Sequence, residues 1–294
     1  MLPQIFLLFF AITTFTEGER IITTLKYSMF HVTPTIVNGN PAVKGKVPYM
    51  VSIKQSVQKL SYKQKLWRNL CGGSIISQWK VLTAAHCFED NNFYYKGHYS
   101  ELRIVAGSLT NEIKHTGQTE TTESAQWRSI AKVTLHREFN FPYHDIALIF
   151  VNSEFVFSHT AVDYVIPARA MTDYPQTCMA AGFGQTGHDK SHKVSQVLLW
   201  TDITVLPRKQ CDVWWEMKMD DFICTISYFT DVSRGDSGGP LSCRRTLDPT
   251  EKKDRHLLVG IVSGKNIDRT TLFIRVAAYK HWLDRNSCNL CEPN

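Results

Sequence analysis

Short runs of apolar residues recur along most of this chain, with polar and turn-forming residues between them. Each run has the length of a β-strand, and no helical spacing of apolar positions separates consecutive runs. The runs cover residues 49–53, 74–76, 102–105, 146–151, 197–200 and 257–263. Many short strands without intervening helices predict an all-β protein, either a barrel or a sandwich.

The pattern changes near the end of the chain. Val276, Tyr279 and Leu283 recur at helical spacing, and Trp282 adds another large apolar side chain to the same stretch. Apolar residues at this spacing share one face of a helix. We therefore expect a C-terminal amphipathic α-helix.

The beginning of the chain carries an apolar run of another kind. Residues 1–15 are nearly all apolar, but the run is too short to span a bilayer comfortably, and no other run is long enough. Thr16 and Gly18 provide a small-x-small cleavage site. Residues 1–18 are thus predicted to be a secretory signal peptide, with an uncleaved anchor as the alternative. The protein is then secreted and extracellular, with no membrane partner.

Composition narrows the class of protein. The 294 residues are 43% hydrophobic and 20% charged, which is an ordinary globular balance for one large domain or two small ones. A net charge of +6 is too mild to indicate nucleic-acid binding, and no zinc-finger spacing, phosphate-cradling loop or dinucleotide fingerprint is present. We expect no nucleic-acid partner, no metal and no cofactor. Eight cysteines, an even number in a chain expected to be secreted, favour disulfides.

The segment 235–240, Gly-Asp-Ser-Gly-Gly-Pro, carries the strongest chemical signal. Its glycines permit backbone angles closed to other residues, so the chain can turn tightly and aim the amides of Gly235 and Ser237 into one small space. Two converging N–H groups form an oxyanion hole. The hydroxyl of Ser237 becomes a useful nucleophile only when a base takes its proton and an acid orients that base.

Two other segments supply candidates for the base and the acid. His86 stands in Thr-Ala-Ala-His-Cys, where small neighbours allow close packing and a disulfide at Cys87 would fix the backbone. Asp145 precedes the apolar run 146–151, and a carboxylate that leads into a buried strand is costly unless it is paired. An imidazole partner would satisfy it and hold the tautomer that accepts the serine proton. The alternative for Asp145 is a residue that caps a turn at a strand edge.

With His86, Asp145 and Ser237 in this order, the chain resembles the trypsin/chymotrypsin family of serine proteases. The resemblance covers residues 36 to about 285 and implies two antiparallel β-barrels with the active site in the cleft between them. It also implies that peptide bonds of a protein or peptide substrate are hydrolysed through an acyl-enzyme. The further matching segments are Ile36-Val37-Asn38-Gly39, Cys71-Gly72-Gly73-Ser74, Gly182-Phe183-Gly184 and Tyr279 with Trp282.

The same resemblance implies domain limits and cross-links. A signal peptide at 1–18 and a propeptide at 19–35 would precede the protease domain at 36–294, with the junction of the barrels at about 155–170. The implied disulfides are Cys71 with Cys87, Cys178 with Cys243, and Cys211 with Cys224. Cys288 and Cys291 are left in the tail, where they could close on each other, stay free or bond another chain.

An inactive precursor is also implied. Cleavage before Ile36 would free an amino group that folds inward, pairs with Asp236 and sets the oxyanion hole. The residue before Ile36 is Thr35, where the family usually has Arg or Lys. We therefore expect that trypsin will not cut there, and that the chain has an activating protease of another specificity or rarely matures. A protein inhibitor is a further candidate partner.

Asp231 takes the position that floors the primary specificity pocket in this family. An aspartate there selects Arg or Lys through charge pairing, and Ser263 is expected to contact the substrate nearby. The alternative for Asp231 is a solvent-exposed loop residue.

The walls of this pocket depart from the family pattern. Ser233 replaces a cysteine, and its usual partner is also missing. Gly264 and Lys265 stand near the places of the usual tryptophan and glycine, and Thr271 stands where a wall glycine is expected. A β-branched side chain and a lysine near the pocket could therefore narrow it or compete for Asp231.

A basic segment lies close to the predicted cleft. Aromatic residues Tyr62 and Trp67 stand among cations, and no acidic residue is present; the cations are Lys54, Lys59, Lys63, Lys65 and Arg68. The segment could be an exosite for an acidic substrate or a sulfated polymer, or a solvated hairpin without a binding role.

Two functional hypotheses follow from these features. The complete set of His86, Asp145 and Ser237 predicts an active secreted endopeptidase, trypsin-like in its preference for Arg or Lys. The altered pocket and the non-basic activation site leave a non-catalytic protease homologue, acting as a binding or regulatory module, as the alternative.

Overall fold

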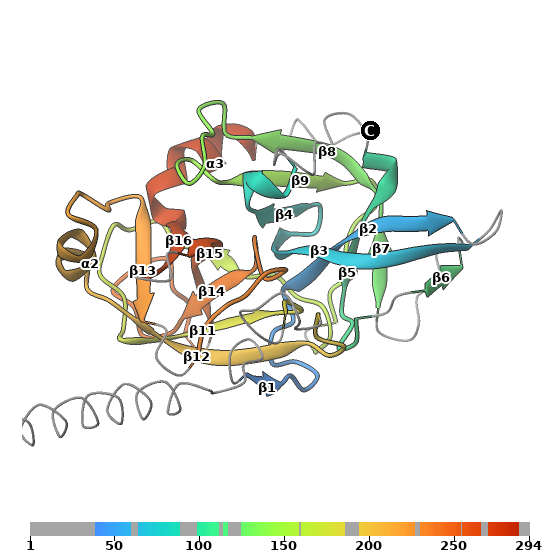
Figure 1. Ribbon diagram of the computed structural model, residues 1–294, viewed down its shortest axis with the longest axis horizontal. Coiled ribbons are helices and arrows are strands. Elements are labelled where there is room, and N and C mark those ends of the chain that lie inside the picture. Colours follow the sequence, from blue (N-terminus) through green and yellow to red (C-terminus); the bar gives the residue numbers. More distant parts are fainter. Residues whose placement is uncertain are drawn as a thin grey trace, which may run out of the picture. The chain divides into compact units, whose positions relative to one another are not determined.

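Two sheets of eight strands each make up most of the protein (Figure 1). The structure is a computed structural model, and it describes residues 39–59, 64–88, 99–111, 114–116, 125–158, 160–185, 194–226, 230–253, 255–265 and 270–287. Ile36, Cys288 and Cys291 therefore lie outside the described residues. So do the predicted signal peptide and propeptide.

The first sheet has the order β7-β5-β2-β3-β4-β9-β8, with β6 paired to β3. All its pairings are antiparallel. The sheet curls, but no pairing between its end strands β7 and β8 occurs among the described residues. Its strands are β2 (Met50–Lys59), β3 (Gln64–Ser77), β4 (Lys80–Thr83), β5 (Leu102–Ala106), β6 (Lys114–Thr116), β7 (Gln126–Arg128), β8 (Ile130–Leu135) and β9 (Ala147–Val151).

The second sheet closes into a barrel of six strands. Its order is β1-β12-β11-β14-β15-β16-β13, and an additional β12–β13 pairing joins the two sides. The short strand β10 pairs with β15 in parallel, and the other pairings are antiparallel. Its strands are β1 (Asn40–Pro41), β10 (Ile166–Pro167), β11 (Thr177–Gly182), β12 (Leu199–Val205), β13 (Phe222–Ile226), β14 (Pro240–Cys243), β15 (Leu257–Lys265) and β16 (Thr271–Arg275).

Strand sequence and burial agree well in both sheets. Every residue of β9 is buried, as its continuous apolar run predicts. Every residue of β16 is buried as well, although Thr271 and Arg275 stand at its ends, whereas β12 alternates between buried and less buried positions. The principal core cluster draws residues from both sheets, and a smaller cluster fills the second barrel. The all-β prediction with two antiparallel barrels is thus confirmed as a fold, with the first sheet less completely closed than the second.

Helical turns are few and short. The single turns η1 (Ala85–Cys87) and η2 (Tyr99–Glu101) belong to the first sheet's loops, and α2 (Arg208–Trp215) precedes β13. The sequence pattern did not predict α2. The expected C-terminal helix is present, but it begins as a 3-10 turn, η3 (Val276–Tyr279), before α3 (Lys280–Asn286). In Figure 1, α3 lies beside β8 and β9, and Lys80 Nζ of β4 donates to the carbonyl of Ser287 at 3.4 Å.

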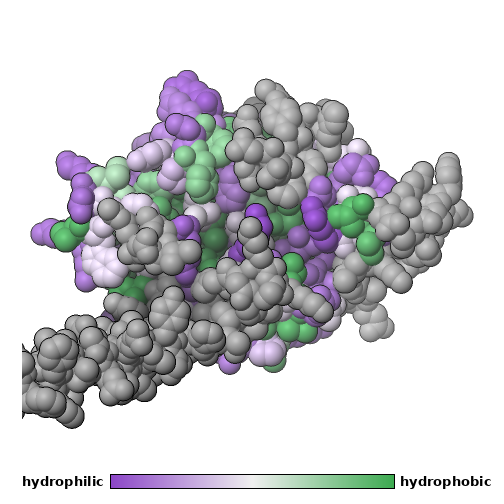
Figure 2. Space-filling view, in the orientation of Figure 1, coloured by the Kyte–Doolittle hydropathy of each residue, from purple (hydrophilic) through white to green (hydrophobic). Residues whose placement is uncertain are grey.

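Among the coloured residues on the face shown in Figure 2, hydrophobic residues are scattered among hydrophilic ones. Among the described residues, no helix has the length and apolarity needed to cross a bilayer.

Candidate active site

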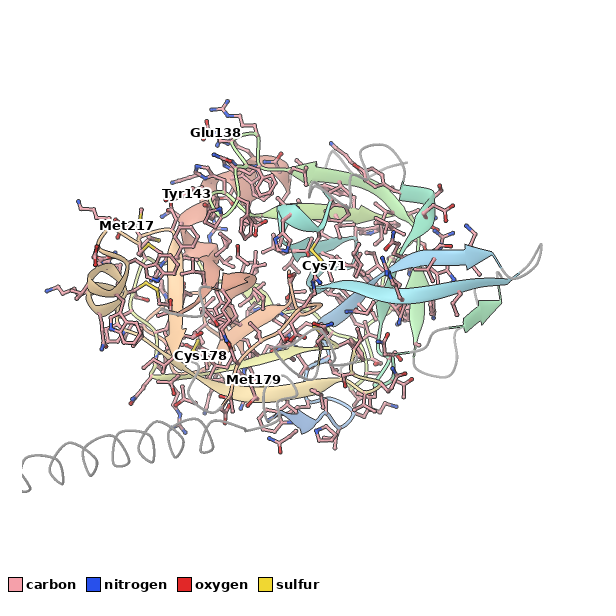
Figure 3. The ribbon with its side chains drawn as sticks, viewed as in Figure 1. Cys71, Glu138, Tyr143, Cys178, Met179 and Met217 are labelled. Carbon is pink, nitrogen blue, oxygen red and sulfur yellow. A yellow bond between two sulfur atoms is a disulfide. The ribbon has the colours of Figure 1, made fainter. Side chains whose placement is uncertain are left out.

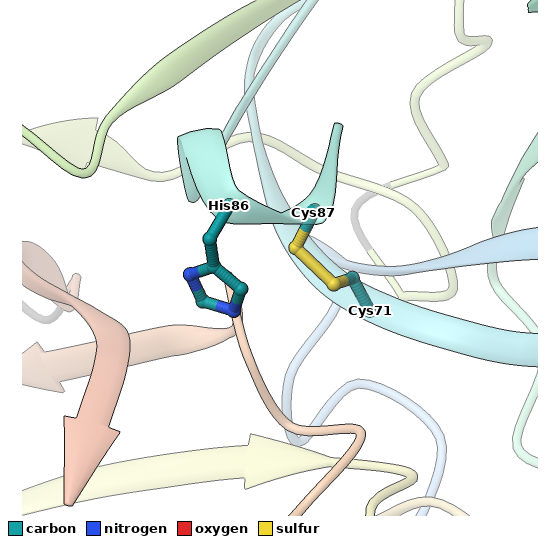
Figure 4. Close-up of side chains that lie close together, drawn as sticks. All are labelled: Cys71, His86 and Cys87. Carbon is teal, nitrogen blue, oxygen red and sulfur yellow. A yellow bond between two sulfur atoms is a disulfide. The ribbon is translucent and has the colours of Figure 1, made fainter. Parts of the chain in front are cut away.

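His86 sits on the single turn η1, and its neighbour Cys87 is bonded to Cys71 of β3 (Figure 4). The disulfide ties the turn to the strand beside it, so the backbone of His86 has little freedom. About a sixth of the His86 side chain is exposed, 17%, which leaves one edge of the ring accessible. The local sequence prediction for this residue, a histidine on a pinned backbone, matches its surroundings.

Asp145 lies two residues before β9 and is fully buried. Its Oδ1 accepts the backbone N–H of His86 at 2.8 Å, and its Oδ2 faces His86 Nδ1 at 2.7 Å. The hydroxyl of Ser263 on β15 also donates to Oδ2, at 2.6 Å. The expected imidazole partner is therefore in place, and a proton on Nδ1 leaves Nε2 as the acceptor.

Ser263 is expected to contact the substrate, and in this structure its hydroxyl is bonded to Asp145. This contact links β15 of the second barrel to the carboxylate of the first. Sequence reasoning did not find it, because the pairing joins residues from different sheets and no local spacing signals it.

Backbone contacts place Ser237 beside the same turn. The amide of Gly72 donates to the Ser237 carbonyl at 2.7 Å, and Cys87 Sγ lies 3.9 Å from that oxygen. Gly235 and Gly238 have positive φ angles of 97° and 78°, a region where a side chain is strained. The predicted need for glycine at this turn is thus visible in the backbone itself.

The amides of Gly235 and Ser237 are the predicted oxyanion donors. Neither donates to an acceptor among the described residues. The carbonyl of Gly235 faces the other way and accepts the side-chain N–H of Asn69 at 2.9 Å. Asn69 is fixed in turn by Ser52, whose hydroxyl donates to its Oδ1 at 2.6 Å. These contacts, which sequence reasoning missed, hold the orientation of the peptide that follows Gly235.

Asp236 is fully buried between the two glycines of the Gly182-Phe183-Gly184 segment. A Cβ at either glycine would overlap its carboxylate, so only glycine fits there. Oδ1 accepts the amide of Gly184 at 2.7 Å and Oδ2 accepts that of Ser233 at 2.9 Å. Burial raises the pKa of Asp236 to about 7, and the charge of Asp231 adds to the rise, while the two amides lower it.

Asp231 is also fully buried, which excludes the exposed-loop alternative. Its Oδ1 accepts the hydroxyl of Thr271 at 2.7 Å, and its Oδ2 forms an ion pair with Lys265 Nζ. The lysine that the sequence placed near this carboxylate is thus bonded to it in the structure. Asp231, Lys265 and Thr271 lie within one corner formed by β15, β16 and the chain before Ser237.

The segment before Asp145 reaches across to the second barrel. The Tyr143 hydroxyl donates to Met217 Sδ at 3.9 Å; both residues are labelled in Figure 3. The half-exposed ring of Phe141 meets His86 edge-on with centroids 5.5 Å apart. It also lies so near Gly264 that a Cβ on that residue would be 3.0 Å from the ring. Phe141 therefore borders the space in front of His86 from the first barrel's side.

His136, Glu138 and His144 offer potential ligand atoms within 4.8 Å of one another. The imidazoles of His136 and His144 stack with centroids 4.6 Å apart and planes inclined by 13°. Their in-plane lone pairs therefore run side by side and do not converge on one ion. Because Nδ1 of His144 is also bonded to the Tyr279 hydroxyl at 3.2 Å, we assign the cluster to packing beneath Asp145.

The basic segment is part of the β2–β3 hairpin. Lys54 points inward, is 1% exposed and donates to Asn111 Oδ1 at 2.7 Å. Lys65 pairs with Glu101, and Arg68 donates to Gln55. The described cations of this segment therefore have local acceptors, which favours the hairpin without a binding role. Lys63 and Tyr62, and the side chain of Lys59, lie outside the described residues.

All three implied disulfides are present: Cys71–Cys87, Cys178–Cys243 and Cys211–Cys224. Cys71 and Cys178, labelled in Figure 3, belong to the first and second sheet respectively. The last disulfide ties α2 to β13. Disulfides of this number are consistent with an extracellular protein.

Comparison with known proteins decides the family. The family described as Trypsin matches residues 36–283, which is most of the chain. This chain belongs to the trypsin family of serine proteases. It is 32% identical to a venom serine protease of Polistes dominula over 197 residues, 66% of each chain. It is 28% identical to chymotrypsin-C of Rattus norvegicus over 259 residues, 85% of this chain and 87% of the relative.

Membership of the trypsin family supports a serine peptidase that acts on protein or peptide substrates. The matched region ends before the tail that holds Cys288 and Cys291.

Proposed function

We propose that this chain is a secreted serine endopeptidase, made as a zymogen, in which Ser237, His86 and Asp145 form the catalytic triad. The observation that carries the proposal is the hydrogen bond between the buried Asp145 and His86 Nδ1. It orients a histidine whose other ring nitrogen is available to the nucleophile, and a buried carboxylate stabilises the imidazolium that forms during the reaction.

The reaction then runs in two halves. His86 Nε2 takes the proton of the Ser237 hydroxyl while its oxygen attacks the substrate carbonyl, and the amides of Gly235 and Ser237 stabilise the negative oxygen. The C–N bond breaks, His86 gives its proton to the leaving amine, and an acyl-enzyme remains. Water, deprotonated by His86, attacks the ester, and Ser237 leaves with the proton restored.

Activation is proposed to depend on Asp236. Its pKa, raised to about 7, is that of a buried carboxylate without enough compensating charge. A new amino group at Ile36 would supply that charge and so favour the backbone arrangement of residues 235–237. The Gly184 amide already bonded to Asp236 would share the carboxylate with it.

Primary specificity for Arg or Lys is what the sequence position of Asp231 predicts. It requires that the carboxylate be available to a substrate cation, and in this structure Lys265 is bonded to it. The same ion pair, together with Thr35 at the activation site, is the feature that favours the alternative, a non-catalytic homologue that acts as a binding or regulatory module.

Covalent labelling separates the two functions. The full chain would carry an enteropeptidase site directly before Ile36, and would be treated with a biotinylated fluorophosphonate before and after cleavage. We expect labelling only after cleavage and none in the matched Ser237→Ala variant. Absence of label from folded protein with a confirmed Ile36 amino terminus would support the binding homologue and overturn the peptidase.

The activation site itself gives a second test. Because Thr35 does not fit a pocket that binds Arg or Lys, brief treatment of the natural full chain with trypsin should not generate an Ile36 terminus. N-terminal sequencing of the products measures this. Recovery of that terminus in good yield would show that the site is open to a trypsin-like activator.

A further inference from the structure

Lys265 and Thr271 are direct neighbours across the β15–β16 ladder. Both point a polar atom at the same carboxylate: Lys265 Nζ pairs with Asp231 Oδ2, and the Thr271 hydroxyl donates to Oδ1 at 2.7 Å. Each oxygen of Asp231 is thus engaged by the chain itself. The side chain of Asp231 is 1% exposed and that of Lys265 is 24% exposed. The lysine therefore lies between the carboxylate and the solvent.

Charge pairing makes this arrangement hard to reverse. A buried carboxylate that loses its cation is left with an uncompensated charge, and a substrate cation must displace Lys265 before it can take its place. The incoming Arg or Lys side chain would lose its hydration on entering the pocket. The ion pair that it forms with Asp231 would only replace the one that Asp231 already has with Lys265. Asp231 consequently offers little net attraction to a basic substrate residue.

The position of Lys265 follows from the strand that carries it. Along β15, Ser263 bonds Asp145, Gly264 lies against Phe141, and Lys265 reaches Asp231. The lysine is thus two residues from the one that contacts the catalytic carboxylate.

We propose that Lys265 is an internal occupant of the primary specificity pocket, so that the enzyme cleaves after short, uncharged residues and not after Arg or Lys. This rests on the proposed peptidase function. Short side chains such as those of Ala or Ser do not need to reach the floor of the pocket. Acidic residues gain little, because the ammonium of Lys265 is already paired with Asp231 and the pair carries no net charge.

The test compares matched substrates on activated full chain. Peptide esters that differ only in Ala or Arg before the scissile bond give two values of kcat/KM, and competition by benzamidine, a cationic pocket probe, gives a third measurement. For the wild type we expect cleavage after Ala to exceed cleavage after Arg, and no competition by millimolar benzamidine.

Lys265→Gly opens the pocket. We expect the ratio of cleavage after Arg to cleavage after Ala to rise by about 100-fold and benzamidine to compete, because a substrate cation can then pair with Asp231. In the double variant Lys265→Gly with Asp231→Ser the gain should disappear. Lys252→Gly, which removes an exposed lysine outside the site, is the matched control and should leave both substrates unchanged.

The outcomes separate the inference from the function on which it rests. Failure of the fluorophosphonate to label Ser237 in the activated wild type overturns the peptidase and the inference together. Two results overturn the inference alone, provided that Ser237 is labelled. One is a wild type whose kcat/KM for cleavage after Arg equals that of the Lys265→Gly variant. The other is a Lys265→Gly variant that gains no cleavage after Arg. If Lys265→Gly does not fold, the ratio of Arg to Ala cleavage in the wild type decides, since a preference for Arg contradicts an occupied pocket.

Discussion

The region around Asp145 and the region around Asp231 are built alike but are suited to different tasks. In each, a fully buried aspartate receives a donor from β15, Ser263 in the first and Lys265 in the second. The other partner of Asp145 is His86, whose charge changes during a proton transfer. The partner of Asp231 is a lysine, a cation that stays with it. The two aspartates are therefore equally buried. They differ in the side chain that faces them, because an imidazole can exchange a proton during a reaction and the ammonium of Lys265 neutralises the carboxylate.

Asp236 sharpens the comparison because it has no side-chain partner of either kind among the described residues. Only the amides of Gly184 and Ser233 bond it, and its pKa is raised to about 7. The three buried aspartates thus differ in their partners: Asp145 meets an imidazole, Asp231 meets an ammonium, and Asp236 meets only backbone amides among the described residues.

The largest expected effect comes from the first region. Asp145→Asn replaces one carboxylate oxygen by an amide, which favours the wrong tautomer of His86 and leaves Nε2 unable to accept the serine proton. We expect kcat to fall by about 10⁴-fold, the size typical of this change in Ser-His-Asp proteases. Steady-state kinetics on activated protein measure it. A fall of less than tenfold would mean that the hydrogen bond to Nδ1 does not orient the base.

Asp236 predicts a pH-dependent stability of the full, uncleaved chain. Since its pKa is raised when folded, the folded state holds the proton more tightly than the unfolded state, and stability is lost as pH rises through the window up to about 7. Relative to the Asp236→Asn variant, the free energy of unfolding of the wild type should fall by about 3 kcal/mol between pH 5 and pH 8.

Urea unfolding at the two pH values measures this difference. After cleavage before Ile36 the difference should shrink, because the new amino group compensates the carboxylate. An equal pH dependence in wild type and Asp236→Asn would show that the carboxylate is already compensated in the precursor.

Ser263→Ala tests the shared strand. It removes one of the three hydrogen bonds to Asp145 and leaves both bonds from His86. A hydrogen bond to a charged group contributes about 1.5–3 kcal/mol, so kcat/KM should fall roughly 10- to 100-fold. The ratio of Ala to Arg cleavage should stay the same, since Lys265 is untouched. A changed ratio would mean that the two regions are coupled through β15.

The smallest effect is expected at the surface. Lys65 and Glu101 form an ion pair, as Lys265 and Asp231 do. The Lys65–Glu101 distance is 3.2 Å, and the two side chains are 33% and 49% exposed. A double-mutant cycle of Lys65→Ala and Glu101→Ala should give a coupling of about 0.5 kcal/mol or less. A coupling above about 2 kcal/mol would show that exposure does not separate the two lysine pairs as proposed here.

The sequence allowed much of this to be predicted. Apolar runs marked strands such as β9 and β15, and the spacing of Val276, Tyr279 and Leu283 marked the final helix. The sequence did not predict features that have no local pattern, such as the helix α2 and the burial of Lys54. The helix α2 has a single fully buried residue, Cys211, so no apolar stripe marks it. Lys54 looked like a surface cation, yet it is buried against Asn111, a partner from another part of the first barrel.

The sequence by itself determined which groups could do chemistry: a serine among glycines, a histidine beside a cysteine, and aspartates next to apolar runs. It did so because backbone freedom, disulfide formation and the cost of burying a charge are properties of neighbouring residues. Only the tertiary structure decided which charge each aspartate meets. The donors to Asp145 and Asp231 come from distant strands. The β15–β16 register set Lys265 with Thr271 against Asp231, and Ser263, at the irregularity of that register between Val262 and Gly264, reaches Asp145.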